Sequence, residues 1–148
     1  MRVFLAGATG VIGIRLIPLH VDDGHVVAVL TRSATMKREL VALNAEPVVC
    51  DVFNLEELTA VLASWTPDVE VDQLTDLPDR IEQLGDFSAR NDRIRTEGTR
   101  NLVAAARAGG ARHFSARQVG SLPSSTTTRS SPNHRRDAVV GKREANAL

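Results

Sequence analysis

Three glycines near the start of the chain have the spacing of a phosphate-binding loop. Gly7, Gly10 and Gly13 follow an apolar run at residues 3–6 and open a segment with helical periodicity at residues 11–21. The first glycine permits a tight turn, the second lets the backbone approach a pyrophosphate, and the third lets the helix pack closely on the strand. Free backbone N–H groups at the helix start then face the anion. The motif predicts a dinucleotide site that includes Gly7, Thr9, Gly10, Val11, Ile12 and Gly13, with a tight turn that binds no ligand as the alternative.

A second group of candidate residues lies about twenty residues further, at the end of the next expected strand. Proteins selective for NAD place an acid there, which accepts hydrogen bonds from the ribose hydroxyls. This chain has Thr31, Arg32 and Ser33 instead. An arginine can pair with a 2′-phosphate, which an acid would repel, so the sequence predicts NADP as the preferred cofactor and NAD as the alternative. A solvated loop arginine is the other interpretation of Arg32.

Strand and helix periods alternate along the first 115 residues. We expect strands at 2–6, 25–31, 47–50, 69–74 and 111–115 and helices at 11–21, 35–43, 55–64 and 96–108, with a polar loop and partial helix over 78–95. Strands separated by helices favour parallel pairing with right-handed crossovers. The predicted class is α/β, a Rossmann-type doubly wound parallel sheet of about five strands.

The composition changes after residue 115. Eight of the eleven residues at 121–131 are Ser or Thr, and residues 115–148 carry six basic and two acidic side chains. We therefore predict an NAD(P)-binding domain at 1–115 and a disordered tail at 116–148. The basic side chains of this tail form no amphipathic or aromatic-interleaved pattern, so we expect no nucleic-acid binding.

The bulk composition is that of an ordinary soluble protein. Lys plus Arg and Asp plus Glu balance at 18 each, and the lone Cys50 excludes an internal disulfide. No run reaches the ~18 apolar residues of a membrane span. The N-terminus lacks the apolar core of a signal peptide, and the four histidines lack metal-ligand spacing. We expect a cytoplasmic protein without a metal site or membrane contact.

Several motifs in order resemble the short-chain dehydrogenase/reductase superfamily, and most closely its NAD-dependent epimerase/dehydratase branch. They are the glycine loop, the Thr31-Arg32 pair, Asp51-Val52, and the segment at 95–102, and the resemblance covers residues 1 to about 114. It implies that Asp51 and Val52 lie against the adenine and that Gln73, Leu74 and Thr75 lie near the nicotinamide ribose. For Asp51, a turn or helix-capping carboxylate is the alternative. We expect Trp65 to fill the core.

The chain departs from this family in its catalytic residues. Members of the family use a Tyr as general acid/base and a Lys four residues later, but this sequence has no tyrosine, and its only lysines are Lys37 and Lys142. We therefore assign no catalytic residue and predict a chain that is inactive alone. One alternative is a non-catalytic NADP-sensing regulatory protein of the atypical type. Another is an enzyme that uses a partner's residues or an acid such as Asp76.

Two further departures concern the fold. Glu70 and Asp72 fall in an expected internal strand, where an unpartnered carboxylate is costly. The family's later helices and strands have no counterpart after the fifth strand, so the resemblance implies truncation there. A sheet left exposed in this way would favour self-association. We hypothesise that the tail is an out-of-frame extension of a shortened gene, because periodicity ends abruptly after Phe114.

Overall fold

The computed structural model describes residues 1–76 and 84–116, with side chains described at 1–76 and 88–116. The predicted tail at 116–148 lies outside the described residues except for Ala116. The domain boundary placed at that point stays a prediction.

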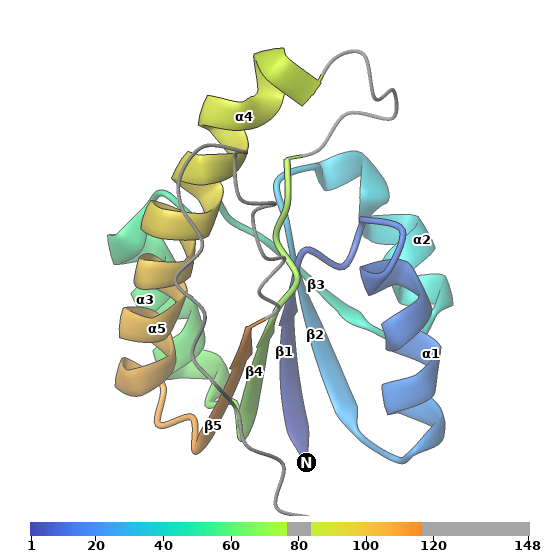
Figure 1. Ribbon diagram of the computed structural model, residues 1–148. Coiled ribbons are helices and arrows are strands. Elements are labelled where there is room, and N and C mark those ends of the chain that lie inside the picture. The colour runs from blue at the N-terminus through green and yellow to red at the C-terminus, as the bar shows by residue number, and fades with distance from the viewer. Residues whose placement is uncertain (77–83, 117–148) are drawn as a thin grey trace, which may run out of the picture. The chain divides into compact units, whose positions relative to one another are not determined.

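Five parallel strands form a single sheet in the order β3-β2-β1-β4-β5 (Figure 1). They are β1 (Arg2–Ala6), β2 (Val26–Thr31), β3 (Glu46–Val49), β4 (Val69–Asp72) and β5 (His113–Ala116). Each expected strand is present to within two residues at either end. The chain moves outward from β1 to β3 and then returns to the other side of β1 for β4. The predicted doubly wound α/β fold is confirmed.

Helices cover both faces of the sheet, α1 and α2 on one face and α3 and α5 on the other (Figure 1). Their bounds are α1 (Gly13–Asp22), α2 (Lys37–Ala42) after a 3₁₀ turn (Ala34–Met36), α3 (Leu55–Trp65), α4 (Leu84–Arg93) and α5 (Thr99–Ala108). A π-helical segment, Ile94–Gly98, joins α4 directly to α5. The segment at 78–95 was expected to be a loop with a partial helix, and it is helical from residue 84 onward. A helix of polar composition occupies it, because it continues into the well-packed α5.

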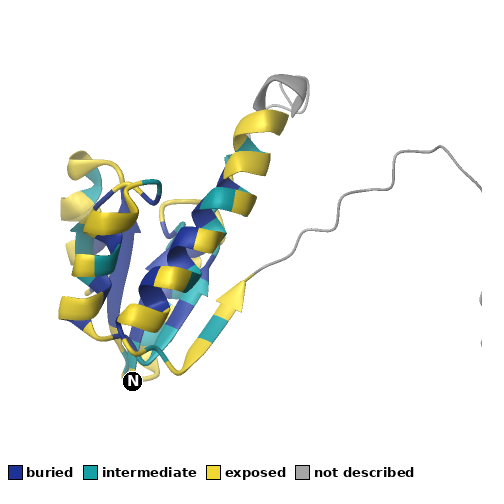
Figure 2. Ribbon diagram, turned by 90° about the vertical axis from the view of Figure 1, so that its left-hand side faces the viewer, coloured by how far each residue is buried: buried dark blue, intermediate teal, exposed yellow. Residues whose placement is uncertain are grey.

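The core consists of two clusters, one on each face of the sheet. Successive strand residues point to opposite faces, so Phe4 packs under α3 and α5 while Leu5 packs under α1 and α2. Figure 2 shows the buried strands behind helices whose outer faces are exposed. Trp65 belongs to the first cluster, with its ring edge-on to Phe4 at 5.9 Å between centroids. Its predicted core position is confirmed.

The β4 and β5 side of the sheet is less regular. Glu70 and Asp72 are buried, as predicted, and both lie on the face covered by α5, since they pair in register with Phe4 and Ala6. Glu70 is fully buried, and neither of its oxygens has a hydrogen-bond partner in the described structure. Strand β5 forms an edge and is mostly exposed (Figure 2).

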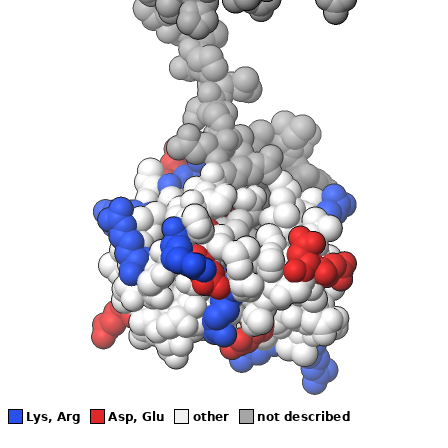
Figure 3. Space-filling view, turned by 90° about the horizontal axis from the view of Figure 1, so that it is seen from below, with Lys and Arg blue, Asp and Glu red and all other residues white. Residues whose placement is uncertain are grey.

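The end of the molecule at which the strands begin carries charges of both signs. Figure 3 shows acidic and basic side chains next to one another on this face, without a large area of one sign. One ion pair, between Arg112 and Asp68 at 2.8 Å, joins the residues that directly precede β5 and β4. In the part of the chain that the structure describes, no helix is both long and apolar enough to cross a membrane.

Candidate functional site

The glycine loop between β1 and α1 is packed so tightly that two positions require glycine. Gly7 has a φ of +81°, and a Cβ there would lie 2.7 Å from the backbone nitrogen of Leu74. A Cβ at Gly13 would lie 2.9 Å from the carbonyl carbon of Ala8. The first glycine lets the ends of β1 and β4 touch, and the second lets α1 begin directly against the loop.

Gly10 and the start of α1 form the open side of the same loop. A Cβ at Gly10 would meet only the Gly7 oxygen, at 3.4 Å, so this position faces free space. The N-cap residue of α1 is Ile12, which provides no side-chain hydrogen bond to the first turn. Ile14 and Arg15 donate their N–H groups to the Gly10 and Ile12 carbonyls, at 3.0 and 3.1 Å. The N–H groups of Val11, Ile12 and Gly13 have no backbone acceptor among the described residues, so they are available to an anion at the positive end of α1. This cradle fits a pyrophosphate.

A cleft extends from this cradle across the carboxyl ends of β1 to β4. It lies where the strand order reverses between β1 and β4, the position where open α/β sheets bind ligands. Its volume is about 170 Å³, and its lining residues are Gly7, Thr9, Gly10, Leu30, Thr31, Arg32, Cys50, Val52, Phe53, Gln73, Leu74, Thr75 and Ile94.

Nine of the fourteen predicted site residues line this cleft. Four lining residues were not predicted from the sequence: Leu30, Cys50, Phe53 and Ile94. The hydrophobic run of β2 and the residues after β3 gave a signal for the first three, whereas Ile94 comes from the polar segment expected to be a loop with a partial helix. The other predicted residues do not line the cleft: Val11, Ile12, Ser33 and Asp51 are exposed beside it, and Gly13 is buried beneath the loop.

Arg32 stands at the cleft end of β2, as the sequence predicted. Its side chain is exposed and makes no ion pair with the described residues. The turn that contains Arg32 is held by a hydrogen bond, since the Thr31 hydroxyl accepts from the Ser33 N–H at 3.1 Å. Among the residues that line the cleft none is acidic, so Arg32 gives this end of the site a positive charge.

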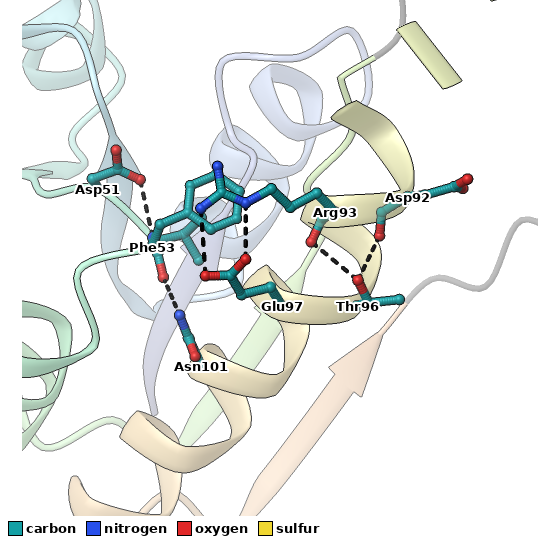
Figure 4. Close-up of polar contacts among 8 residues, drawn as sticks. Asp51, Phe53, Asp92, Arg93, Thr96, Glu97 and Asn101 are labelled. Atoms are coloured by element: carbon teal, nitrogen blue, oxygen red, sulfur yellow. Dashed lines mark hydrogen bonds and ion pairs between the residues drawn. The ribbon is translucent and has the colours of Figure 1, made fainter. Parts of the chain in front are cut away.

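The loop after β3 is held by its own side chains and by α5. Asp51 accepts a hydrogen bond from the Phe53 N–H at 3.0 Å, which is the turn role considered as its alternative. Asn101 is buried on α5 and donates its side-chain amide to the Val52 carbonyl at 3.0 Å (Figure 4). Gly98 lies beside Val52, and a Cβ at Gly98 would be in ordinary van der Waals contact with the Val52 side chain, at 3.5 Å. These contacts place the Val52 side chain in the cleft.

The loop after β4 is held from the same helix. Asp72 accepts hydrogen bonds from the Leu74 N–H at 2.9 Å and from the Thr99 hydroxyl at 2.6 Å. The segment at 95–102 therefore fixes two cleft-forming loops at once, through Asn101 on one side and Thr99 on the other. This contact pattern gives a physical reason for that sequence motif.

The structure defines the surroundings of two side chains that could take part in chemistry, Cys50 and Asp76. Burial, with a contribution from Glu57, raises the pKa of Cys50 to about 11, so the thiol stays protonated at neutral pH. Asp76, considered above as an alternative acid, forms an ion pair with Arg90 at 2.8 Å. Within the described residues, no group of three His, Cys, Asp or Glu side chains is arranged to hold a metal ion.

Comparison with known proteins agrees with this geometry. The model of a family described as NAD(P)H-binding matches residues 7–147. The chain belongs to this NAD(P)H-binding family. A 3-diazoavenalumate denitrifying reductase from Streptomyces sp. is 40% identical over 119 residues, which are 80% of this chain and 38% of the reductase.

Solved structures with the same fold include two enzymes with bound NAD. UDP-glucose-4-epimerase from Stenotrophomonas maltophila, with bound NAD and formylated UDP-arabinopyranose, matches with a TM-score of 0.67 and 15% identity over 78% of this chain and 36% of the epimerase. WbmG from Bordetella bronchiseptica, in complex with NAD, matches with a TM-score of 0.63 and 23% identity over 78% and 36%. The chain spans less than two fifths of the length of these relatives. This chain thus contains an NAD(P)H-binding Rossmann domain that is structurally similar to that of NAD-dependent epimerases.

Proposed function

We propose that this chain binds NADP in preference to NAD and that these residues do not by themselves carry out the proton transfer typical of the family. The observation that carries the proposal is Arg32, an exposed, unpaired guanidinium in the described structure at the cleft end of β2. A cleft without acidic lining residues favours a cofactor that carries an additional phosphate.

The glycine cradle would hold the pyrophosphate, and Arg32 would contact the 2′-phosphate. The loops after β3 and β4 would then line the adenosine and nicotinamide-ribose ends through Val52 and through Gln73, Leu74 and Thr75. A bound nicotinamide would supply or accept a hydride. The chain itself would bind and orient the cofactor, because no tyrosine is available as a proton donor.

Calorimetric titration with NADP and NAD tests the cofactor preference. We expect tighter binding of NADP by wild type, and Arg32→Glu to weaken NADP binding about 10- to 100-fold with a much smaller effect on NAD, as for loss of a charge-assisted hydrogen bond. Arg107→Glu, on the exposed end of α5, is the matched charge reversal and is expected to change neither affinity. Unchanged NADP affinity in Arg32→Glu would contradict the phosphate contact.

Turnover tests the second part of the proposal. The purified chain is expected not to consume NADPH with a panel of carbonyl compounds, diazo compounds and nucleotide sugars. Consumption of NADPH above the buffer control would show that the chain has a proton donor other than the family's Tyr and Lys. The Streptomyces relative, named as a reductase, motivates the inclusion of diazo substrates.

A further inference from the structure

A guanidinium stacks on an aromatic ring at the edge of the cleft. The Arg93 guanidinium carbon lies 4.0 Å from the centroid of the Phe53 ring, and Phe53 is one of the lining residues. Glu97 holds the same guanidinium through its Nε at 2.8 Å and a terminal nitrogen at 3.4 Å (Figure 4). The Arg93 side chain is 59% exposed, so the ion pair and the ring contact are the two interactions that orient it over Phe53.

The local backbone explains how these side chains meet. Arg93 is the last residue of α4, and Glu97 lies one turn later, in the π-helical segment. In that turn the Thr96 hydroxyl donates to the Asp92 carbonyl at 2.7 Å (Figure 4). Hydrogen bonding to Arg93 holds the pKa of Glu97 below its ordinary value, so the pair is ionised at neutral pH.

The position of Phe53 relative to the cradle indicates which part of a dinucleotide it would meet. In this fold the pyrophosphate lies at the start of α1 and the adenosine ribose at the end of β2. The base then extends beyond β2, toward the residues that follow β3. Those residues are Cys50, Val52 and Phe53, whose backbone is fixed by Asp51 and Asn101. In the described structure, the Phe53 ring contacts a side chain from α4, that of Arg93.

The geometry points to Arg93 as a positioning residue for the adenosine end: with Glu97, it fixes the Phe53 ring as a wall against which the adenine of NADP or NAD packs. This inference rests on the proposed function. Because Glu97 neutralises Arg93, the pair offers no net charge to a 2′-phosphate. Arg93 therefore supports both cofactors equally, whereas Arg32 distinguishes them.

Calorimetry with NADP, NAD and 5′-AMP tests this role on folded protein. We expect Arg93→Ala to weaken all three ligands by the same factor, about three- to tenfold, as for loss of an ordered aromatic contact. Phe53→Leu should weaken them similarly, and the double variant should be no weaker than either single variant, because both act through one ring. Arg107→Ala, which removes an exposed arginine at the far end of α5, is the matched control.

Each result separates the possibilities. Additive losses in the double variant, or loss of NADP binding alone, would overturn the positioning role, since they indicate independent or phosphate-directed contacts. If the wild type binds both cofactors and Arg93→Ala binds them with the same affinities, this inference is overturned and the proposed function stands. A wild type that binds neither cofactor would overturn both. Lower thermal stability of Arg93→Ala with unchanged affinity would also contradict the inference, because it indicates a purely structural role.

Discussion

The two neighbouring central strands β1 and β4 are built in different ways. All four inner residues of β1 are apolar and buried, whereas β4 places Glu70 and Asp72 on the face covered by α5. Asp72 lies at the carboxyl end of its strand, where the Leu74 N–H and the Thr99 hydroxyl reach it. Glu70 lies two residues earlier, and both its oxygens are without partners among the described residues. The position of a carboxylate along a buried strand thus decides whether it is satisfied.

The largest expected effect on the free energy of unfolding comes from substitution of Glu70. Burial, with a smaller contribution from Asp72, raises its pKa to about 9 from an ordinary 4.5. Glu70→Leu removes a buried group without a partner, so we expect the free energy of unfolding at pH 8 to rise by several kcal/mol, given ~1.4 kcal/mol per pKa unit. Urea denaturation measures this change. Glu56→Gln, on the exposed side of α3, serves as the control and should have little effect; a destabilised Glu70→Leu protein would contradict the assignment.

The pH dependence of stability follows from the same group. Between its ordinary pKa of 4.5 and about 9, the folded protein holds a proton on Glu70 that the unfolded chain has released. The free energy of unfolding should therefore fall as pH rises through this window. Urea titrations at several pH values test this slope. Glu70→Gln, of nearly equal shape and neutral throughout, should flatten it, and an unchanged slope would mean that other groups cause it.

The junction between the two strands is expected to be the next most sensitive point. Gly7→Ala introduces a Cβ beside the backbone of Gln73 and Leu74 at a φ of +81°, so we expect a loss of about 2–4 kcal/mol and impaired NADP binding. Gly24→Ala is the matched control, because Gly24 has a φ of +77° but nothing within 4 Å of its Cβ. Equal losses in the two variants would show that the close contact between strand ends contributes nothing.

The smallest expected effect on stability concerns Asp72, the β4 carboxylate that has hydrogen-bond partners. Thr99→Val removes the hydroxyl that donates to Asp72 at 2.6 Å and should cost about 1–3 kcal/mol, as for a hydrogen bond to a charged group. Thr59→Val, which removes an exposed hydroxyl bonded to the Leu55 carbonyl, should cost less than ~0.5 kcal/mol. Thermal unfolding compares them. A neutral Thr99→Val would mean that Asp72 is satisfied by the Leu74 N–H alone.

Much of the fold could be predicted from the sequence because its signals are local. Apolar runs marked the strands, and the glycine spacing marked the loop between β1 and α1. The extent of α4 was not predicted, because its composition is polar and it continues through the π-helical segment into α5, which a local pattern does not show. Phe53 directly follows the predicted Asp51-Val52 pair, so its place at the cleft could have been expected, whereas its contact with Arg93, forty residues away in the sequence, could not.

The sequence by itself determined the class of a doubly wound parallel sheet, the glycine loop and the presence of Arg32 at the end of β2, because periodicity, turn chemistry and residue type are properties of short segments. Only the tertiary structure decided the strand order, which carboxylate in β4 has partners, and how the segment at 95–102 fixes two loops through Thr99 and Asn101. Those outcomes depend on contacts between residues far apart in the chain, and such contacts are set by packing rather than by local pattern.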